Sequence, residues 1–347
     1  MTPGETCPVS ILDHKHIVLG HGSGGKLTQD LIEKLFLPNF SNDYLAQLND
    51  QAVLDVNGSR LAYTTDSFVV TPIFFPGGDI GRLAINGTVN DLAMSGATPR
   101  FIAAAFILEE GLATDDLARV VESMRQAAQQ AGVLLVTGDT KVVNRGKGDQ
   151  IFITTTGLGV VERAVEISAD RARPGDRILL SGTIGDHGMA IMSRREGLEF
   201  EGPIESDTAP LHTLVAEMLD ASEEIHCLRD PTRGGVATIL NEIAARSQIG
   251  MELDDRSVPV RESVKGACEI LGLDPLYVAN EGKLVAVVGR DAADAVLDRM
   301  RNHPLGRDAR CIGEVTADHP RRVLVTTEIG GTRVLDVMLG EPLPRIC

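Results

Sequence analysis

The stretch FIAAAFILEEGLATDDLARVVESMRQAAQQAGVLLVTGDTK, residues 101–141, decides the fold class. Its apolar run 101–108 has the length and composition of a strand. A helix follows, which Thr114 caps and Gly132 ends. Its apolar residues recur at helical spacing: Leu117, Val120, Val121, Met124 and Ala128. Residues 133–136 then predict a strand of the buried type that leads into Thr137–Lys141. Strand, helix and strand in this order predict an α/β or α+β domain.

The segments on either side extend this domain. Residues 60–70 (RLAYTTDSFVV) predict a strand that Asp66 interrupts, and residues 151–155 predict another. A helix after Gly77-Gly78 carries Asn86, Asn90 and Asp91. Asn86 and Asn90 are four residues apart and share a face, so with Asp91 they would offer oxygen ligands together. A polar surface face is the alternative explanation.

A turn at 173–176 predicts a domain boundary, because strands and helices resume in a second series beyond it. The strands are expected at 177–181, 284–288, 311–315, 322–327 and 333–338, and the helices after Gly185 and at 211–219, 235–246, 262–271 and 292–301. We therefore expect a leader with a glycine-rich loop and helix at 1–40. After it we expect an amino-terminal domain at 41–165, a carboxy-terminal α/β domain at 166–338 and a tail at 339–347.

A glycine-rich loop, GHGSGGK at residues 20–26, precedes a helical pattern that Pro38 is expected to end. The loop matches the spacing G-x-x-x-x-G-K. The next residue is Leu27, where a P-loop requires Ser or Thr to hold magnesium. We favour a mobile loop that covers phosphates, with Lys26 contacting a phosphate, over a true P-loop. A plain turn without a ligand is the remaining alternative.

Composition excludes several function classes. Lysine and arginine number 33 against 49 acidic residues, a net charge of −16 that disfavours nucleic acids and anionic membranes. The chain shows neither a signal peptide nor an apolar run long enough to span a membrane, so a cytoplasmic location is expected. Five cysteines at wide spacing and without a C-x-x-C pair indicate neither disulfides nor a zinc site.

The chain ends in GEPLPRIC, residues 340–347. Two prolines disfavour helix, so an extended, mobile arm is expected, with the Cys347 thiol at its end. Free cysteines are usually buried. A thiol at the terminus therefore indicates chemistry, although a frayed tail with an inert cysteine is the alternative.

Asp66, Asp91 and Asp139 each lie in or just after an apolar element, within a short polar stretch. Magnesium prefers oxygen ligands and keeps phosphates in its shell, so these carboxylates suit an Mg–ATP site. A cap or turn is the alternative for each one. Glu281 would add a base, and Asp230 with Arg233 would add a phosphate-binding guanidinium, unless those two form a structural ion pair.

Seven motifs spread over nearly the whole chain resemble the HypE family of hydrogenase maturation factors, which are carbamoyl dehydratases. They are HGSGGK (21–26), TTDSF (64–68), NGTVNDLAMSGA (86–97), TGDTKVV (137–143), RDPTRGG (229–235), NEGKL (280–284) and PRIC (344–347). Most are shared with the superfamily of aminoimidazole ribonucleotide synthetase, selenophosphate synthetase and thiamine-monophosphate kinase. The terminal PRIC distinguishes the HypE family.

The resemblance implies a two-domain fold like that of aminoimidazole ribonucleotide synthetase, with the amino-terminal sheet pairing across a homodimer and ATP between the domains. It implies that the carbamoyltransferase HypF loads a carbamoyl group on Cys347. ATP then activates this S-carboxamide for dehydration to a thiocyanate. The nitrile passes to iron in the HypC–HypD complex, as a cyanide ligand of [NiFe]-hydrogenase.

The resemblance also assigns roles to residues. Lys141 and Glu281 match the family's residues for proton removal, and Asp66, Asp91 and Asp139 would hold Mg–ATP. Lys26, Asn90, Asp230 and Arg233 complete the nucleotide site. A lysine acts as a base only when neutral, and its ordinary pKa of ~10.4 opposes this, so Glu281 is favoured as the base.

Two other functions stay open at this point. One is a non-catalytic scaffold with a degenerate nucleotide site and a tail that docks a partner. The other is a small-molecule kinase or synthetase of the same superfamily, for which Cys347 would be dispensable.

Overall fold

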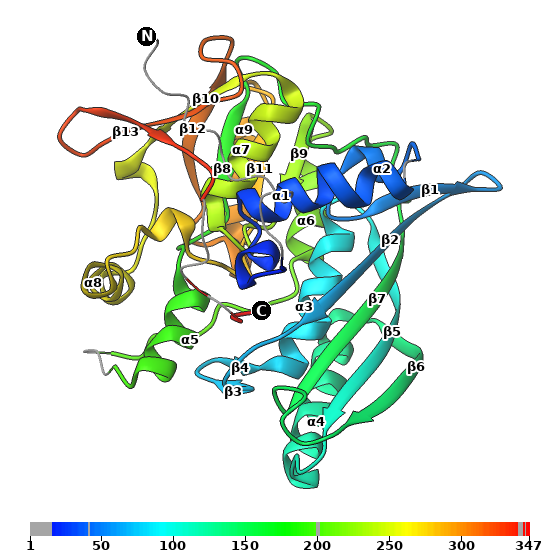
Figure 1. Cartoon of the computed structure of the whole chain (residues 1–347). Helices are drawn as coiled ribbons and strands as arrows, with labels where there is room; N and C mark the ends of the chain where they lie inside the picture. The colour runs from blue at the N-terminus through cyan, green and yellow to red at the C-terminus, as the bar shows by residue number, and fades with distance from the viewer. Residues whose placement is uncertain (1–15, 41, 199–201, 339–342, 344) are drawn as a thin grey trace.

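A computed structural model describes residues 16–40, 42–198, 202–338, 343 and 345–347. The fold is built on two sheets that follow one another in the chain (Figure 1). Residues 1–15 of the predicted leader, which include Cys7, and residues 339–342 and 344 of the predicted tail lie outside the described residues.

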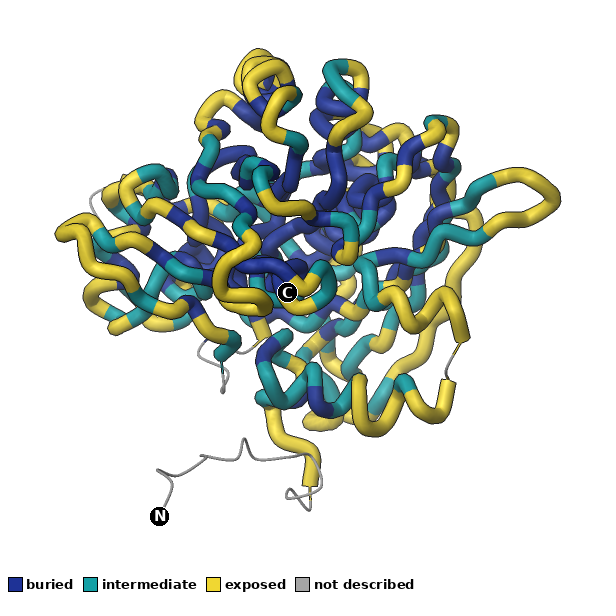
Figure 2. Tube along the Cα trace, turned by 90° about the horizontal axis from the view of Figure 1, so that it is seen from above, coloured by how far each residue is buried: buried dark blue, intermediate teal, exposed yellow. Residues whose placement is uncertain are grey.

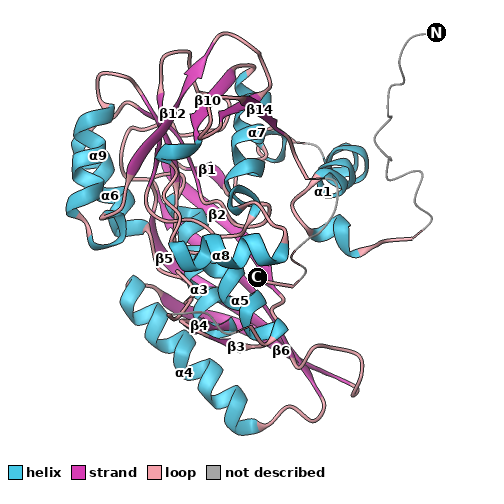
Figure 3. Cartoon of the chain, turned by 90° about the vertical axis from the view of Figure 1, so that its left-hand side faces the viewer, coloured by secondary structure: helices cyan, strands magenta, loops and turns pink. Residues whose placement is uncertain are grey.

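The first sheet has the strand order β1-β2-β7-β5-β6, in which only β5 and β6 run parallel. Its strands are β1 (Ala52–Val56), β2 (Ser59–Phe68), β5 (Thr98–Glu109), β6 (Leu134–Val143) and β7 (Ile151–Val160). The helices α3 (Ile80–Ala93) and α4 (Thr114–Ala131) cover one face (Figures 1 and 3). Strand β7 alternates between buried and half-buried residues, because every second side chain points at α3. A short hairpin, β3 (Phe74–Phe75) and β4 (Gly78–Asp79), leads into α3.

The second sheet has the order β14-β13-β10-β12-β8-β11-β9. Its strands are β8 (Arg177–Leu180), β9 (Ile225–Arg229), β10 (Gly250–Asp254), β11 (Val285–Val288), β12 (Arg310–Thr316), β13 (Val323–Thr326) and β14 (Thr332–Leu335). Helix α7 (Gly235–Ser247) covers one face, and α6 (His212–Ala221) and α9 (Ala293–Asn302) cover the other (Figure 3). On β11, Val285 and Val287 join the core under α7, whereas Ala286 and Val288 join the core under α6 and α9. A sheet covered on both faces explains the continuous apolar run that predicted this strand.

Helix α5 (Asp186–Glu196) ties the two halves together. Its Met189, Ala190 and Ile191 belong to the same apolar core as Ile80 and Leu83 of α3. Helix α8 (Glu262–Leu271) contributes to this core as well. The amino- and carboxy-terminal halves therefore share packing in addition to their connecting chain.

The glycine-rich segment contains the 3-10 turn η2 (Leu19–Gly22) and continues into α1 (Lys26–Leu31), the π-helical turn η3 (Ile32–Phe36) and α2 (Leu37–Phe40). Further 3-10 turns are η4 (Leu45–Gln47), η5 (Asp255–Ser257), η6 (Pro275–Tyr277) and η7 (Pro304–Gly306). The expectation that Pro38 ends the helix is wrong, because helical backbone runs to Phe40. The π-helical turn just before Pro38 breaks the regular hydrogen-bond ladder there, so a missing donor is tolerated. Among the described helices, none is long and apolar enough to cross a membrane.

Two other local predictions need correction. Ala113, in extended backbone, is the N-cap of α4, so Thr114 is its first helical residue. The strand predicted as buried, β6, is exposed along nearly its whole length. Leu134, Val136 and Val142 are 63%, 57% and 68% exposed. This strand lies at the edge of the sheet, where one side has no neighbour in the described chain.

Candidate active site

Four aspartates from four separate elements gather between the two sheets. Asp66 lies on β2 and Asp91 on α3, Asp50 precedes β1, and Asp230 follows β9. Burial raises the pKa of Asp66 above its ordinary value, and its interaction with the adjacent Asp91 carboxyl partly offsets this rise. Asp91 Oδ2 also accepts a hydrogen bond from the Thr64 hydroxyl at 2.8 Å. The structure thus brings together three predicted site residues, Asp66, Asp91 and Asp230, and adds Asp50.

These carboxyls resist ionisation because they lie out of water and beside one another. Burial raises the pKa of Asp50 to about 6, although Arg229 Nη1 lies 3.0 Å from its Oδ1. Burial, followed by the nearby Asp66, Asp230 and Asp50, raises the pKa of Asp91 well above its ordinary value. The pKa of Asp230 is raised for the same reasons. A cluster of this kind is stabilised by a bound cation.

The donor set fits a hard divalent ion such as Mg²⁺. All its members are carboxylates, and the buried Oδ2 of Asp50 lacks a hydrogen-bond partner. Within the described chain, no three acidic, histidine or cysteine side chains are already arranged as a metal site. Magnesium usually takes one or two carboxylates and completes its shell with waters and phosphates, so a preformed cage is not required.

The raised pKa of Asp50 has a measurable consequence. In the folded protein Asp50 stays protonated up to about pH 6, whereas in the unfolded chain an aspartate ionises at pH ~4. Between these two pH values only the unfolded chain releases the proton, so the free energy of unfolding falls as the pH rises. Asp50→Asn should therefore gain stability relative to the parent as the pH rises from 4 to 6, by about 3 kcal/mol. Thermal unfolding in a metal chelator measures the difference. Asp298→Asn, at an exposed position on α9, serves as the control and should show no such trend.

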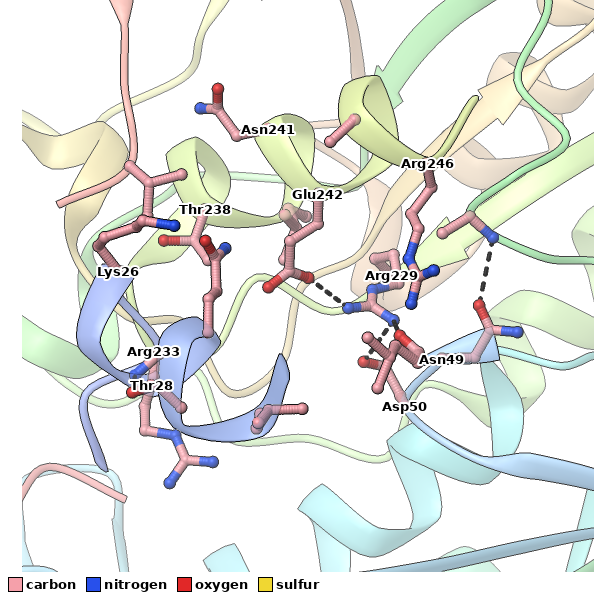
Figure 4. A pocket seen from close by; sticks show the side chains of 18 of the residues that line it. Lys26, Thr28, Asn49, Asp50, Arg229, Arg233, Thr238, Asn241, Glu242 and Arg246 are labelled. Carbon is pink, nitrogen blue, oxygen red and sulfur yellow. Dashed lines mark hydrogen bonds and ion pairs between the residues drawn. The ribbon is translucent and has the colours of Figure 1, made fainter. Parts of the chain in front are cut away.

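A cleft of about 1760 Å³ opens beside the cluster, between α1 and α7 (Figure 4). Lys26 and Thr28 line it from one side, and Thr238, Glu242 and Arg246 from the other. Lys26 Nζ lies 3.0 Å from Asp30 Oδ1, on the same helix. The cleft is large enough for a nucleotide, and Lys26 stands at its wall as predicted.

Two glycines hold the glycine-rich loop against the second domain. A Cβ on Gly24 would lie 2.9 Å from the Arg233 carbonyl oxygen, and one on Gly25 would lie 2.5 Å from that of Met338. Gly24 also has a φ of +78°, which disfavours other residues. The loop therefore closes one side of the cleft and brings Lys26 and Arg233 to the same region.

Cys347 is docked in this region, whereas a mobile arm was expected. The carboxyl terminus lies in the middle of the molecule, beside buried chain (Figure 2). Val69 N donates to the Cys347 carbonyl oxygen at 3.0 Å, and the side chains of Leu343 and Ile346 are buried. A cavity of about 300 Å³ adjoins Cys347 and Arg233. The negative charge of Cys347 raises the pKa of Arg233 more than any other neighbour does.

Glu281 is buried in the loop before β11. Its backbone N donates to Asp207 Oδ1 at 3.0 Å, and its own Oε1 has no hydrogen-bond partner among the described residues. Burial, then the charges of Asp230, Asp207 and Asp66, raise the pKa of Glu281 well above its ordinary value. A carboxyl with an elevated pKa and a free oxygen is suited to accept a proton during catalysis.

The structure does not bring Asp139 and Lys141 into this cluster within one chain. Both lie on the exposed strand β6, where Lys141 Nζ pairs with Asp139 at 3.0 Å. Strands β7 and β5 separate β6 from β2, so Asp139 is about 14 Å from Asp66 at the usual strand spacing. One ion cannot be held by both residues of the same chain.

Asn90 is used by the protein itself. Its Nδ2 donates to the carbonyl oxygens of Ala209 and Glu281, and its Oδ1 accepts from Leu211 N at 2.8 Å. Both amide protons are therefore engaged. The side chain fastens α3 to the second domain instead of facing a ligand.

Three residues with contacts at this site were not predicted from the sequence. Asp50 precedes β1, and β1 was not predicted. The tail carbonyls are bound by His187 and Arg195, both on α5. The polar residues just before a strand could have predicted Asp50 as a site residue. The sequence of α5 itself gives no indication that this helix contacts a segment 150 residues away.

Comparison with known proteins gives the family. The AIR synthase related protein N-terminal domain matches residues 48–161, and the corresponding C-terminal domain matches residues 173–325. The chain is 59% identical to carbamoyl dehydratase HypE of Azotobacter vinelandii over 94% of this chain and 96% of that protein. A crystal structure of a HypE–HypF complex superposes with a TM-score of 0.85 at 51% identity, covering 89% of this chain and 99% of that one. A HypE structure in complex with ATP gives 0.81 at 52% identity, covering 96% and 100%.

Proposed function

The chain belongs to the HypE family of carbamoyl dehydratases, and from this premise we propose that it dehydrates an S-carboxamide on its own Cys347 to a thiocyanate, using ATP. The observation that carries the proposal is the docked terminus. Cys347 lies beside Arg233 and a cavity of about 300 Å³, at the edge of the carboxylate cluster. A substrate attached to the terminal sulfur would reach this cavity without further folding.

The chemistry requires two protons and one oxygen to leave the carboxamide. ATP supplies the phosphoryl group that makes the amide oxygen a good leaving group. Arg233, close to Cys347, is placed to neutralise charge on that oxygen or its phosphate. The nitrile forms when the two protons have been taken from nitrogen and the bond between carbon and the phosphorylated oxygen breaks, which releases phosphate.

Glu281 is the proposed base. It is buried, has an unpartnered oxygen and adjoins Asp66 and Arg233. Lys141 is 70% exposed and paired with Asp139, and within one chain it has neither the burial nor the cationic neighbours that favour a neutral amine. Glu281 must be ionised to act, and a cation bound to the adjacent aspartates would favour that form.

We propose that Asp66 and Asp91, with Asp50 and Asp230, hold the magnesium of Mg–ATP. Their mutual repulsion when ionised supports this, because the ion would relieve it. Lys26 and Arg233 would contact phosphates along the cleft. A relative solved with ATP supports nucleotide binding here.

A homodimer formed through β6 is part of the proposal. The exposed apolar residues of this edge strand continue onto the open face of the sheet, where Tyr63, Phe101 and Ile107 are 47%, 42% and 42% exposed. Exposed apolar patches of this kind mark interfaces, and a free edge strand is a template for pairing. Pairing would bring Asp139 and Lys141 to the junction of two chains.

The dimer gives a direct prediction. Val136→Glu places a charge on the exposed first half of β6 and should shift the protein from dimer to monomer in light scattering. Val121→Glu, on the outer face of α4 with 48% exposure, is the matched control and should stay dimeric. A monomeric parent protein would contradict the proposed dimer.

Two protein partners follow from the proposed cycle. HypF would load the carbamoyl group, which the solved complex of a related HypE with HypF supports. The HypC–HypD complex would receive the cyanide for the iron of [NiFe]-hydrogenase. A reduced thiol and ATP are both required, and these are conditions of the cytoplasm.

Mass spectrometry of the carboxy-terminal peptide tests the function. Protein loaded by HypF should lose the mass of one water at Cys347 when MgATP is added. ATP hydrolysis without this change would indicate a kinase or synthetase activity. Neither hydrolysis nor water loss would indicate a scaffold.

A further inference from the structure

We propose that Arg195 and His187, on α5, are positioning residues that hold the Cys347 strand in the active site by its backbone carbonyls. The proposal rests on the function above, since it concerns how the substrate-bearing tail is presented. In this proposal α5 determines how long the sulfur stays docked, and other residues carry out the chemistry.

The tail forms a short antiparallel pairing with the chain after β2. Ile346 bridges Val70, Val69 N donates to the Cys347 carbonyl oxygen at 3.0 Å, and Thr71 N donates to that of Arg345 at 3.2 Å. Among the described residues, these two backbone hydrogen bonds join the tail to the chain after β2. A strand of this length is marginal alone and needs support from side chains.

Arg195 supplies one support. Its Nη2 donates to the Arg345 carbonyl oxygen at 2.8 Å and to the Thr71 carbonyl oxygen at 2.7 Å. One guanidinium thus joins the tail to the segment with which the tail pairs. Hydrogen bonds from a charged donor are stronger than neutral ones, so this contact contributes more than either backbone bond.

His187 supplies the other support from the buried side. Its Nε2 lies 2.6 Å from the Ile346 carbonyl oxygen, and its Nδ1 lies 2.8 Å from the Ser206 hydroxyl. Because a carbonyl only accepts, Nε2 must carry the proton, and Nδ1 of the neutral ring then accepts from Ser206. Phe75 packs edge-on against the ring, with centroids 5.6 Å apart, and fixes its plane.

These contacts do not involve the sulfur. Arg195 and His187 bind main-chain oxygens of residues 345 and 346. They can therefore hold the tail in the same way whether the sulfur is a free thiol, an S-carboxamide or a thiocyanate. The cavity at Cys347 has a volume of about 300 Å³. A second protein is too large to enter it, so a loading enzyme cannot reach the docked sulfur through this cavity. The tail must therefore leave α5 for loading and return for dehydration.

The test measures tail release through the reactivity of the thiol. Arg195→Met removes the donated bonds and keeps the length of the side chain, and Cys347 should then be alkylated about tenfold faster in the apo protein. Arg194→Met, at the exposed neighbouring position on α5, should leave the rate unchanged. Arg195→Lys, which can still donate to a carbonyl, should restore most of the difference. Peptide mass spectrometry gives each rate, with Cys311 as the internal reference.

Deuterium exchange gives an independent readout, because the amides of Val69 and Thr71 lose their acceptors when the tail leaves. Both should exchange faster in Arg195→Met, and carbamoyl loading by HypF should accelerate with them. Equal Cys347 rates in the Arg194 and Arg195 variants would overturn the proposal. Faster alkylation of Cys311 would also overturn it, since it would mean a general loosening. The alkylation and deuterium-exchange measurements need neither ATP nor carbamoyl groups, so they stand apart from a failure of the proposed dehydration.

A surface ion pair provides a second variant. Arg345 Nη1 lies 2.7 Å from Asp149 Oδ2 in the loop between β6 and β7. Asp149→Arg should raise the Cys347 alkylation rate modestly, about twofold, because exposed pairs are weak. The double variant Asp149→Arg/Arg345→Asp should return it to the parent rate. Failure of this reversal would mean that Arg345 does not contribute to docking.

Discussion

Replacement of Cys347 by alanine should abolish nitrile formation and leave the fold intact. The sulfur is the proposed attachment point of the carbamoyl group, and Cys227, another described thiol near Asp50 of the cluster, is fully buried. The side chain is only half-buried, whereas Leu343 and Ile346 anchor the tail. Removing one partly exposed sulfur should cost less than about 1 kcal/mol of unfolding free energy.

The measurement combines thermal unfolding with mass spectrometry of the terminal peptide after incubation with HypF, carbamoyl donor and MgATP. Cys311→Ala, at another half-buried thiol, is the matched control and should keep full activity. A nitrile on the Cys347→Ala protein would place the acceptor elsewhere. A loss of stability like that of a core truncation, about 2–5 kcal/mol, would make the cysteine structural.

Sequence reasoning predicted the alternation of strands and helices well, because it depends on local periodicity. The strand 284–288 and the helix ending at Gly132 illustrate this, since each lies within about one residue of its observed position. The strands at 52–56, 225–229 and 250–254 were missed.

Burial was harder to predict than secondary structure. Residues 133–136 are as apolar as any core strand, yet β6 is an exposed edge. An apolar run indicates that the side chains of a strand are shielded from water. It does not indicate whether the same chain or a second copy shields them. The prediction that Asp139 joins Asp66 at one ion depended on the same unknown, the position of β6 in the sheet.

The site divided along similar lines. Asp66 and Asp91 were predicted because each lies in or just after an apolar element, and Asp230 was predicted from its stretch with Arg233. Asp50 precedes an unpredicted strand. The contacts of α5 with the tail span about 150 residues of sequence and involve backbone oxygens, so no residue pattern encodes them.

The second large effect concerns Glu281. Glu281→Gln should still bind ATP and accept the carbamoyl group, but it should form the nitrile about 10²–10⁴-fold more slowly, which corresponds to roughly 3–5 kcal/mol of barrier. The amide keeps the volume of the buried side chain and removes its ability to take a proton. Single-turnover mass spectrometry of carbamoylated protein mixed with MgATP reads the loss of water at Cys347 over time. Glu269→Gln, on the exposed face of α8, is the control.

The pH dependence separates a base from a merely structural carboxyl. Because burial and the nearby aspartates raise the pKa of Glu281, the fraction ionised grows as the pH rises through that elevated value. The rate of the parent protein should therefore increase with pH across that range, and the residual rate of Glu281→Gln should lose this increase. A parent-like rate in the Gln variant would leave Lys141 of a neighbouring chain or a phosphate oxygen as the base. Loss of ATP binding in the variant would instead place Glu281 in the metal shell, where an anionic oxygen beside Asp66 and Asp230 would serve as a ligand.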